Sequence, residues 1–276
     1  MAQQAEKAQP TSGELGDLVA TFRGRPTVVP CLLIGIVAGL AVWLGFGFWQ
    51  RPTAAHAIAG TIVGLTVAAG LFLLGFRRSR RLSVQVHASG LAYRAKATQE
   101  TWAWDEVEEF FVLAERPGAP RTIVDAMFFW LATRYQVRYR ICRPGHERTF
   151  DSLIRRQARL GAMVEDFVTQ AQLPGALASL GSGEPVRFGK LQLGPDGLAY
   201  HSARHPRSLP LEALGHVSVT RYAVKVHQAG HRLPWLTAER SAVPNAAVLA
   251  RLAEHIVAAR DADDKDDADA GQAASR

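Results

Sequence analysis

The sequence predicts a two-helix transmembrane hairpin followed by an α+β, mainly β, region that is built twice. Two long uncharged apolar runs near the start predict the hairpin. Strand-like alternation of apolar and polar residues predicts the sheets, and helical spacing at the end of each half predicts a closing helix. An internal repeat shows that the two halves are copies of one unit.

Two apolar runs follow a polar N-terminal segment, residues 1–25. Pro26 to Gln50 carries no charge over 25 residues, and Pro52 to Phe76 carries none over another 25. A helix needs about 20 apolar residues to cross the hydrocarbon core of a membrane. We therefore expect transmembrane helices at 26–50 and 52–76, joined by a tight turn at Arg51.

The flanking charges predict an orientation. Arg77-Arg78-Ser79-Arg80-Arg81 follows the second run, and Arg23 and Arg25 precede the first. The positive-inside rule then places both termini in the cytoplasm. High Ala and Arg content suggests a bacterial source, so the predicted location is the bacterial cytoplasmic (inner) membrane.

Small residues recur in both apolar runs. Folding the hairpin at Arg51 brings Gly39 near Gly64 and Gly35 near Ala68. Small residues four apart on two helices permit close backbone contact. We expect these residues to pack the hairpin internally; the alternative is a seam between two copies of the chain.

The repeat is visible in Gly90-Leu91-Ala92-Tyr93, which returns as Gly197-Leu198-Ala199-Tyr200. At an offset of 107 residues, 84–112 aligns without a gap on 191–219. A later strand aligns at an offset of 87, so the first copy carries 20 additional residues. The predicted domains are 82–177, with an insertion at 113–133, and 184–260.

Each copy ends in a predicted amphipathic helix, at 154–171 and at 245–259. Leu173-Pro174-Gly175 is expected to end the first of them. The tail 261–276 contains six aspartates and has no apolar pattern, so it is predicted to be disordered.

Several short motifs carry a family resemblance over roughly 82–258. They are Gly183-Glu184, Phe188-Gly189-Lys190-Leu191, Gly197-Leu198, Leu209-Pro210-Leu211-Glu212 and Val243-Pro244-Asn245, with Trp104-Asp105-Glu106-Val107 in the first copy. Together with strands followed by one helix, they resemble an uncharacterised family of membrane-anchored proteins with tandem pleckstrin-homology-like (PH-like) domains. The resemblance implies two antiparallel sandwiches or barrels, each with a C-terminal helix, and implies no activity.

A basic stripe marks the same strand in both copies. Opposite the apolar residues of each strand lie Arg134, Arg138 and Arg140 in the first copy, and Arg221, Lys225 and His227 in the second. With a net charge of +7, the chain would suit anionic lipid headgroups. The alternative is an ordinary solvated strand face.

The insertion contains an apolar run that includes Met127, Phe128, Phe129 and Trp130. Such a run is typical of a strand buried on both faces, and packing between the two domains is one interpretation. Contact with a membrane or a partner protein is the other, because exposed apolar patches usually mark interaction sites.

Enzymatic motifs are missing from the sequence. It contains no P-loop, nucleophile elbow or HExxH motif, and its two cysteines, Cys31 and Cys142, have no evident catalytic partner. We therefore expect a protein that is not an enzyme, with no cofactor, no metal and no nucleic-acid partner.

The predicted function is non-enzymatic binding or scaffolding at a membrane surface, with an anionic lipid or a protein as partner. The alternative is an accessory subunit of a larger membrane complex that uses the transmembrane hairpin as its interface, with homo-oligomerisation as one variant.

Overall fold

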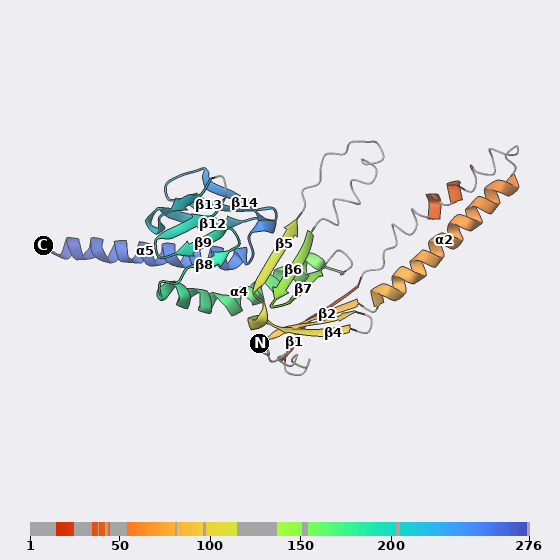
Figure 1. Ribbon diagram of the computed structural model, residues 1–276, viewed down its shortest axis with the longest axis horizontal. Helices are drawn as coiled ribbons and strands as arrows, with labels where there is room; N and C mark the ends of the chain where they lie inside the picture. The colour runs from red at the N-terminus through yellow and green to blue at the C-terminus, as the bar shows by residue number, and fades with distance from the viewer. Residues whose placement is uncertain are drawn as a thin grey trace, which may run out of the picture. The chain divides into compact units, whose positions relative to one another are not determined.

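The computed structural model describes residues 15–24, 35–37, 39–41, 44, 54–80, 82–95, 98–114, 137–150, 154–202 and 205–274. The chain divides into two compact units. Unit 1 comprises residues 1–102 and 152–157, and unit 2 comprises 103–151 and 158–276. The elements of both units are coloured and labelled along the chain in Figure 1.

Unit 1 contains a four-stranded antiparallel sheet of order β1-β2-β3-β4. Its strands are β1 (Leu18–Arg23), β2 (Leu82–His87), β3 (Gly90–Ala95) and β4 (Thr98–Ala103), and helix α2 (Ala54–Arg80) precedes β2. The side chains of Val84, Val86, Leu91 and Trp102 are fully buried. This sheet is therefore the core of unit 1.

Strand β1 was not predicted, and it comes before the two apolar runs. It pairs with β2 in the register Phe22 with Val84 and Arg23 with Ser83. Residues 154–155 pair with the C-terminal end of β1. Gly24 forms a β-bridge with Ile154, and the Arg155 N–H donates to the Arg23 carbonyl at 2.9 Å. Residues 18–23 of the N-terminal segment are thus part of the first sheet.

Unit 2 begins with a short helical turn, η1 (Trp104–Glu106), and a three-stranded antiparallel sheet of order β5-β6-β7. These strands are β5 (Glu109–Ala114), β6 (Val137–Arg143) and β7 (His146–Phe150), and helix α4 (Gln157–Gly181) follows them. Trp104 stacks on Phe167 of α4, with ring centroids 5.4 Å apart. The helix therefore packs on the first turn of this unit.

The rest of unit 2 repeats the order found so far along the chain, which is a four-stranded sheet, a three-stranded sheet and a helix. A four-stranded sheet contains β8 (Val186–Phe188), β9 (Leu191–Gly194), β10 (Gly197–Tyr200) and β11 (Arg207–Leu209). After η2 (Leu211–Ala213), a three-stranded sheet contains β12 (Leu214–Val219), β13 (Ala223–Gln228) and β14 (Pro234–Glu239). The turn η3 (Arg240–Ala242) then leads into α5 (Ala246–Ala274).

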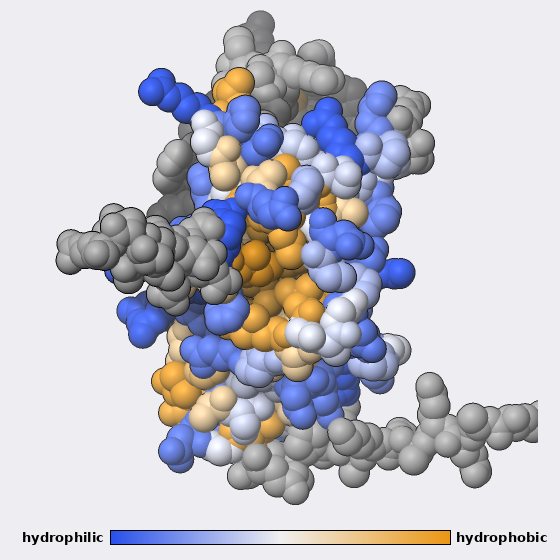
Figure 2. Space-filling view, turned by 90° about the vertical axis from the view of Figure 1, so that its left-hand side faces the viewer, coloured by the Kyte–Doolittle hydropathy of each residue, from blue (hydrophilic) through white to orange (hydrophobic). Residues whose placement is uncertain are grey.

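One core lies beneath α5. Leu191, Leu193, Val224, Leu249 and Leu252 are fully buried in it. Seen from the side at which α5 ends, an apolar area is framed by hydrophilic side chains (Figure 2). Several apolar side chains accordingly pack on this core while part of their surface stays open, among them Leu177, Leu180, Leu211, Ala213 and Ile256.

The predicted membrane hairpin needs correction. Within the ranges that the structure describes, no helix combines the length and the apolar character needed to cross a membrane. Of the first run, the structure describes the helical residues 35–37, 39–41 and 44. Helix α2 mixes small residues with its aliphatic ones and ends in arginines. For the described residues, the transmembrane helices at 26–50 and 52–76 are therefore wrong.

The predictions that depended on these transmembrane helices are wrong as well. They are the fold class that begins with a transmembrane hairpin, the integral membrane protein with both termini in the cytoplasm, and the bacterial inner-membrane location. All three depend on the two spans, for which no suitable helix is found among the described residues. The described residues form four small antiparallel sheets with a few helices.

Both closing helices are longer than predicted. Helix α4 continues through Pro174 to Gly181, and α5 continues to Ala274 across a segment whose composition predicts disorder. An interior proline costs a helix roughly 3 kcal/mol. Beyond that proline, the side chains of Leu177 and Leu180 pack on the core under α5, and this packing offsets the cost.

Candidate functional site

A groove of about 700 Å³ lies in unit 2, between the three-stranded sheet β5–β7 and the three-stranded sheet β12–β14. We call it the β5–β14 groove. Its lining residues are Leu113, Ala114, Arg138, Tyr222, Ala223, Thr237, Ala238, Glu239 and Ser241. A volume in this range is typical of a binding pocket.

Side chains along β5 and β6 alternate between two faces of the sheet, and this explains which of them line the groove. Leu113 pairs with Arg138 and Phe111 pairs with Arg140, so these four side chains share one face of the sheet. The opposite face is apolar and buried, and there Phe110 stacks on Tyr139 with ring centroids 6.0 Å apart. Arg138 is exposed at the groove as a result.

The second wall is built in the same way. On β13, Val224 and Val226 are fully buried, which turns Ala223, Lys225 and His227 to the outer face. Across the strand pair, Ala223 lies opposite Glu239 and Lys225 lies opposite Thr237. The outer faces of both three-stranded sheets therefore line the groove.

The basic residues predicted from sequence are distributed unevenly around this groove. Arg138 lines it, and the guanidinium of Arg221 lies 5.6 Å from the ring centroid of Tyr222, another lining residue. Lys225 shares the outer face with Thr237. The groove thus brings together Arg138 from the first copy and Tyr222, the residue after Arg221, from the second, which sequence alone did not show.

Arg140 is held away from the groove by its own neighbours. Its guanidinium carbon lies 4.2 Å from the centroid of the Phe111 ring, and its Nη1 lies 3.7 Å from Glu147 Oε1. Arg134, Met127, Phe128, Phe129 and Trp130 lie outside the described residues. The two interpretations of the apolar insertion at 113–133 therefore remain predictions.

The small residues of the predicted hairpin lie in unit 1. A Cβ built on Gly39 would meet the carbonyl oxygen of Gly60 at 2.8 Å and the Cα of Gly64 at 3.3 Å. One built on Gly35 would overlap the side chain of Ala68. The helical residues 35–37 and 39–41 thus approach α2 through Gly35, Gly39, Gly64 and Ala68.

Asn245, the residue before α5, is hydrogen-bonded to β5 and the residue before it, although its only sequence signal was membership of a short motif. Its N–H donates to the Phe110 carbonyl at 2.9 Å, and its Oδ1 accepts from the Phe110 N–H at 2.7 Å. Its Nδ2 donates to the Glu108 carbonyl at 2.6 Å. No sequence pattern reveals such a contact between residues 135 positions apart.

A buried ion pair reinforces this junction. Arg240 in η3 donates from Nη2 to Glu165 Oε1 of α4, and only 5% of the Arg240 side chain is exposed. Gln172 of the same helix donates to the Val107 carbonyl at 2.5 Å. Burial raises the pKa of the nearby Tyr139 hydroxyl; Arg221 and Arg240 lower it and Glu165 raises it. Side chains of α4 are thus tied to η3 and to the segment just before β5.

Two histidines stack on the outer face of β12 and β13. His216 and His227 are cross-strand partners with ring centroids 4.2 Å apart and planes 6° apart. Desolvation, then the charges of His216 and Lys225, lower the pKa of His227.

Across the described ranges, no group of three or more His, Cys, Asp and Glu side chains is placed to hold a metal ion.

Comparison with known proteins identifies a family. A family model described as "Family of unknown function (DUF6585)" matches residues 1–262. The chain belongs to this family, which confirms that it belongs to an uncharacterised one. No curated protein and no solved structure matches the chain significantly.

Proposed function

We propose that the chain is a non-enzymatic protein-binding module and that the β5–β14 groove receives its partner. The observation that carries this proposal is the meeting of Arg138, from the first copy, with Tyr222, from the second, at one groove. Arginine and tyrosine are the residues that most often dominate the binding energy of protein interfaces.

The order of elements supports a PH-like assignment of the two halves. Four strands, three strands and a helix occur as β1–β4, β5–β7 and α4, and again as β8–β11, β12–β14 and α5. Such folds serve mainly as platforms for ligands and partner proteins, although a fold alone does not define a function. The groove, and not the fold, therefore carries the proposal.

Photo-crosslinking in native cells tests it. A photoreactive residue at Thr237, which is exposed and lines the groove, should form an adduct with a protein partner. The matched control is Glu254, an exposed position on α5. The adduct should disappear when Arg138→Glu and Arg221→Glu are combined. An identical adduct from Glu254, or none from Thr237, would overturn the proposal.

A second candidate function is that of a subunit in a larger assembly. It is favoured by exposed aliphatic side chains on the helical residues of unit 1, among them Ile36, Leu40, Ile62 and Leu65, all more than half exposed. An apolar helix of another subunit would cover them. Combining Ile62→Gln and Leu65→Gln should then reduce the particle mass in native mass spectrometry, and an unchanged mass would count against this role.

A further inference from the structure

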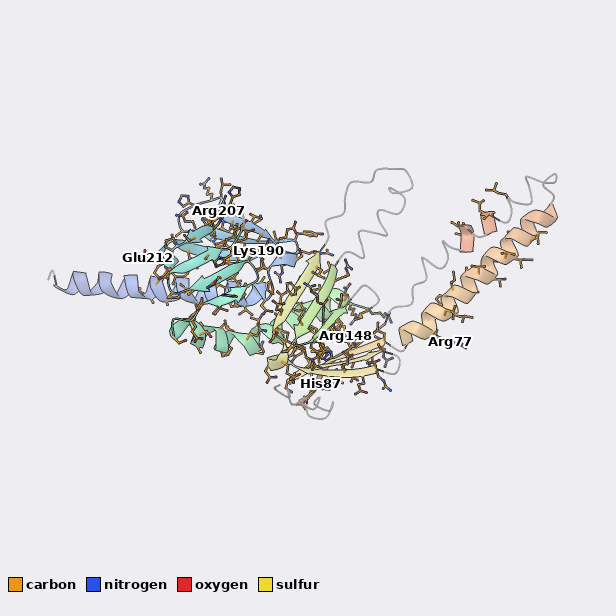
Figure 3. The ribbon with its side chains drawn as sticks, in the orientation of Figure 1. Arg77, His87, Arg148, Lys190, Arg207 and Glu212 are labelled. Carbon is orange, nitrogen blue, oxygen red and sulfur yellow. The ribbon has the colours of Figure 1, made fainter. Side chains whose placement is uncertain are left out.

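Two loops of unit 2 end next to each other. One connects β10 to β11 and the other connects β13 to β14. Arg207, the first residue of β11 and labelled in Figure 3, donates from Nη1 to the Trp235 carbonyl of β14 at 3.1 Å. This hydrogen bond holds the ends of the two loops together. We call residues 201–207 and 229–235 the basic loops.

The basic loops carry no carboxylate. They contain three arginines and three histidines, and neither Asp nor Glu. The side chains of His205, Arg207, His231 and Arg232 are exposed. Within the described part of the chain, neither of these two arginines forms an ion pair with a carboxylate. Their positive charges are therefore available to a partner.

An aliphatic side chain protrudes from the second loop. Leu233 is 81% exposed, more than any other large apolar side chain of the described residues. Gly230, with a φ of 74°, makes the turn of this loop, and Leu233 precedes Pro234, so its main chain is held extended. A partner that matches this surface must therefore offer negative charge and an apolar area together.

Helix α5 reaches the same part of unit 2. Arg260 donates from Nη1 to the carbonyls of Glu212 and Leu214, each at 2.9 Å. The N–H of Ala229, at the start of the second basic loop, donates to the Ala213 carbonyl at 2.9 Å. Because all three carbonyls belong to one short segment, Arg260 and the second basic loop are neighbours.

The part of α5 that follows is strongly acidic. Residues 261–274, which we call the acidic end of α5, contain six aspartates and one lysine. Aspartate is a poor helix former, and negative charge near the C-terminal end of a helix opposes the helix dipole. Figure 1 shows α5 projecting beyond the sheets of unit 2, so its acidic end leads away from the basic loops of its own copy. A basic surface on another molecule would stabilise it.

Partly open apolar side chains lie on this side as well. Leu211 and Ala213 of η2 and Ile256 of α5 pack on the core and keep part of their surface open. The side at which α5 ends shows an apolar area framed by hydrophilic side chains (Figure 2). One side of unit 2 thus combines basic loops, an apolar area and an acidic helix. Such a surface is complementary to a second copy of itself.

We propose that two copies of the chain associate through this side, with the acidic end of α5 of each copy lying on the basic loops of the other. Leu233 of each copy then packs beside Leu211 and Ile256 of the other, and twofold symmetry makes every contact twice. A lipid or nucleic-acid surface would attract the arginines and repel the acidic end that begins beside them. None of these residues lines the β5–β14 groove, so the inference is independent of the function proposed above.

Photo-crosslinking of the full-length chain identifies the contact. A chain with a photoreactive residue at Leu233 is mixed with nitrogen-15-labelled chain, so that adducts between copies are distinguished from adducts within one. We expect position 233 to form an adduct with residues 261–274 of the labelled copy. The control position is Leu18 of β1, which is 53% exposed and should give no such adduct. Adducts within one copy only, or none, would overturn the proposal.

Charge reversal tests the complementarity. Arg207→Glu with Arg232→Glu reverses the basic loops, and Asp264→Lys with Asp266→Lys and Asp267→Lys reverses the acidic end. Either set should raise the dissociation constant of the dimer roughly tenfold or more in sedimentation velocity. An equimolar mixture of the two should restore association, because each reversed surface then meets its reversed counterpart. A mixture that stays dissociated, or sets that associate as the parent does, would refute the proposal.

Two matched substitutions test the apolar contact. Leu233→Ser should raise the dissociation constant roughly tenfold through the lost burial, whereas Leu18→Ser should leave it unchanged. Equal effects of the two would contradict the contact. A parent chain that stays monomeric, and instead binds vesicles of anionic lipid through Arg207 and Arg232, would assign the basic loops to another occupant and remove the dimer.

Discussion

Asn245 meets two demands that few residues combine. Its φ of 50° lies in the left-handed region, which asparagine and glycine tolerate best. Its side-chain amide also serves the Glu108 carbonyl and the Phe110 N–H at once. Alanine would disfavour the left-handed backbone and would lack the side-chain hydrogen bonds, whereas glycine would lack only the hydrogen bonds.

Substitutions at Asn245 should separate these contributions. Asn245→Ala leaves two main-chain groups without partners and strains the backbone, so it should lower the free energy of unfolding by roughly 2–4 kcal/mol. Asn245→Gly should recover only the backbone part, about 1 kcal/mol. Urea denaturation measures all three chains, and equal stability of the alanine and glycine variants would contradict this assignment.

Gly161 and Gly175 provide a matched pair within α4. A Cβ on Gly161 would overlap the ring of Tyr139, whereas a Cβ on Gly175 meets nothing within 4 Å. Gly161→Ala should therefore destabilise the protein by about 1–3 kcal/mol through overpacking. Gly175→Ala should stabilise it by about 0.5–1 kcal/mol, because alanine favours the helix. Thermal unfolding compares them, and two shifts of the same sign would contradict the packing at Tyr139.

At the scale of the element, the strand pair β12–β13 should make stability depend on pH. The lowered pKa of His227 means that the unfolded chain takes up its proton first as the pH falls. Stability should therefore be complete above the ordinary pKa of histidine, about 6.5, and should decline as the pH falls from there to the folded pKa. The groups that face His227 are His216 on β12 and Lys225 on β13.

His216→Gln tests this dependence, since it removes the stacked neighbour. The pKa of His227 should rise toward its ordinary value, as followed by NMR titration of its ring protons, and the decline in stability below about pH 6.5 should become shallower. An unmoved titration curve would show that the stacked ring does not perturb His227.

The elements that sequence predicts well are those with a strong local period. The predicted alternation of Val137 and Tyr139 with Arg138 agrees with the burial along β6, where Val137 and Tyr139 are buried and Arg138 is exposed. Local chemistry is a poorer guide at Pro174, where a proline that normally ends a helix lies inside one. The reason is tertiary, because Leu177 and Leu180 lie beyond it and pack on the core under α5.

For the candidate site, sequence predicts the arginines and not the groove. Arg138 and Arg221 were identified as basic positions on two strands that are far apart in the chain. That Arg138 and Tyr222, the residue after Arg221, lie at one groove depends on the placement of β5, and Asn245 holds β5 through three hydrogen bonds. Such long-range pairing has no periodic signature.

At the scale of the whole molecule, the N-terminal strand is the least expected feature. Leu18 to Phe22 is short, and its partner lies beyond both apolar runs, so local patterns gave no reason to join them. The internal repeat nevertheless contained a signal for a strand before β2. The second copy begins with β8, before β9, and a counterpart in the first copy had to precede β2.

Removal of residues 1–24 tests the contribution of β1. The truncation deletes the buried side chains of Leu15 and Phe22 and exposes the edge of β2. In hydrogen–deuterium exchange, amides of β2 and β3 should lose protection, while those of β12 and β13 in unit 2 should keep it. Unchanged protection of β2 would show that β1 contributes nothing to its sheet.

The pairing of β1 with β2 also constrains folding during synthesis. Arg23 pairs with Ser83, and at about 5–20 residues per second the ribosome needs roughly 3–12 seconds to make the residues between them. Throughout that interval β1 has left the ribosome without its partner, and its closing contacts at residues 154–155 come later still. Until β2 emerges, β1 of the nascent chain therefore has no strand partner.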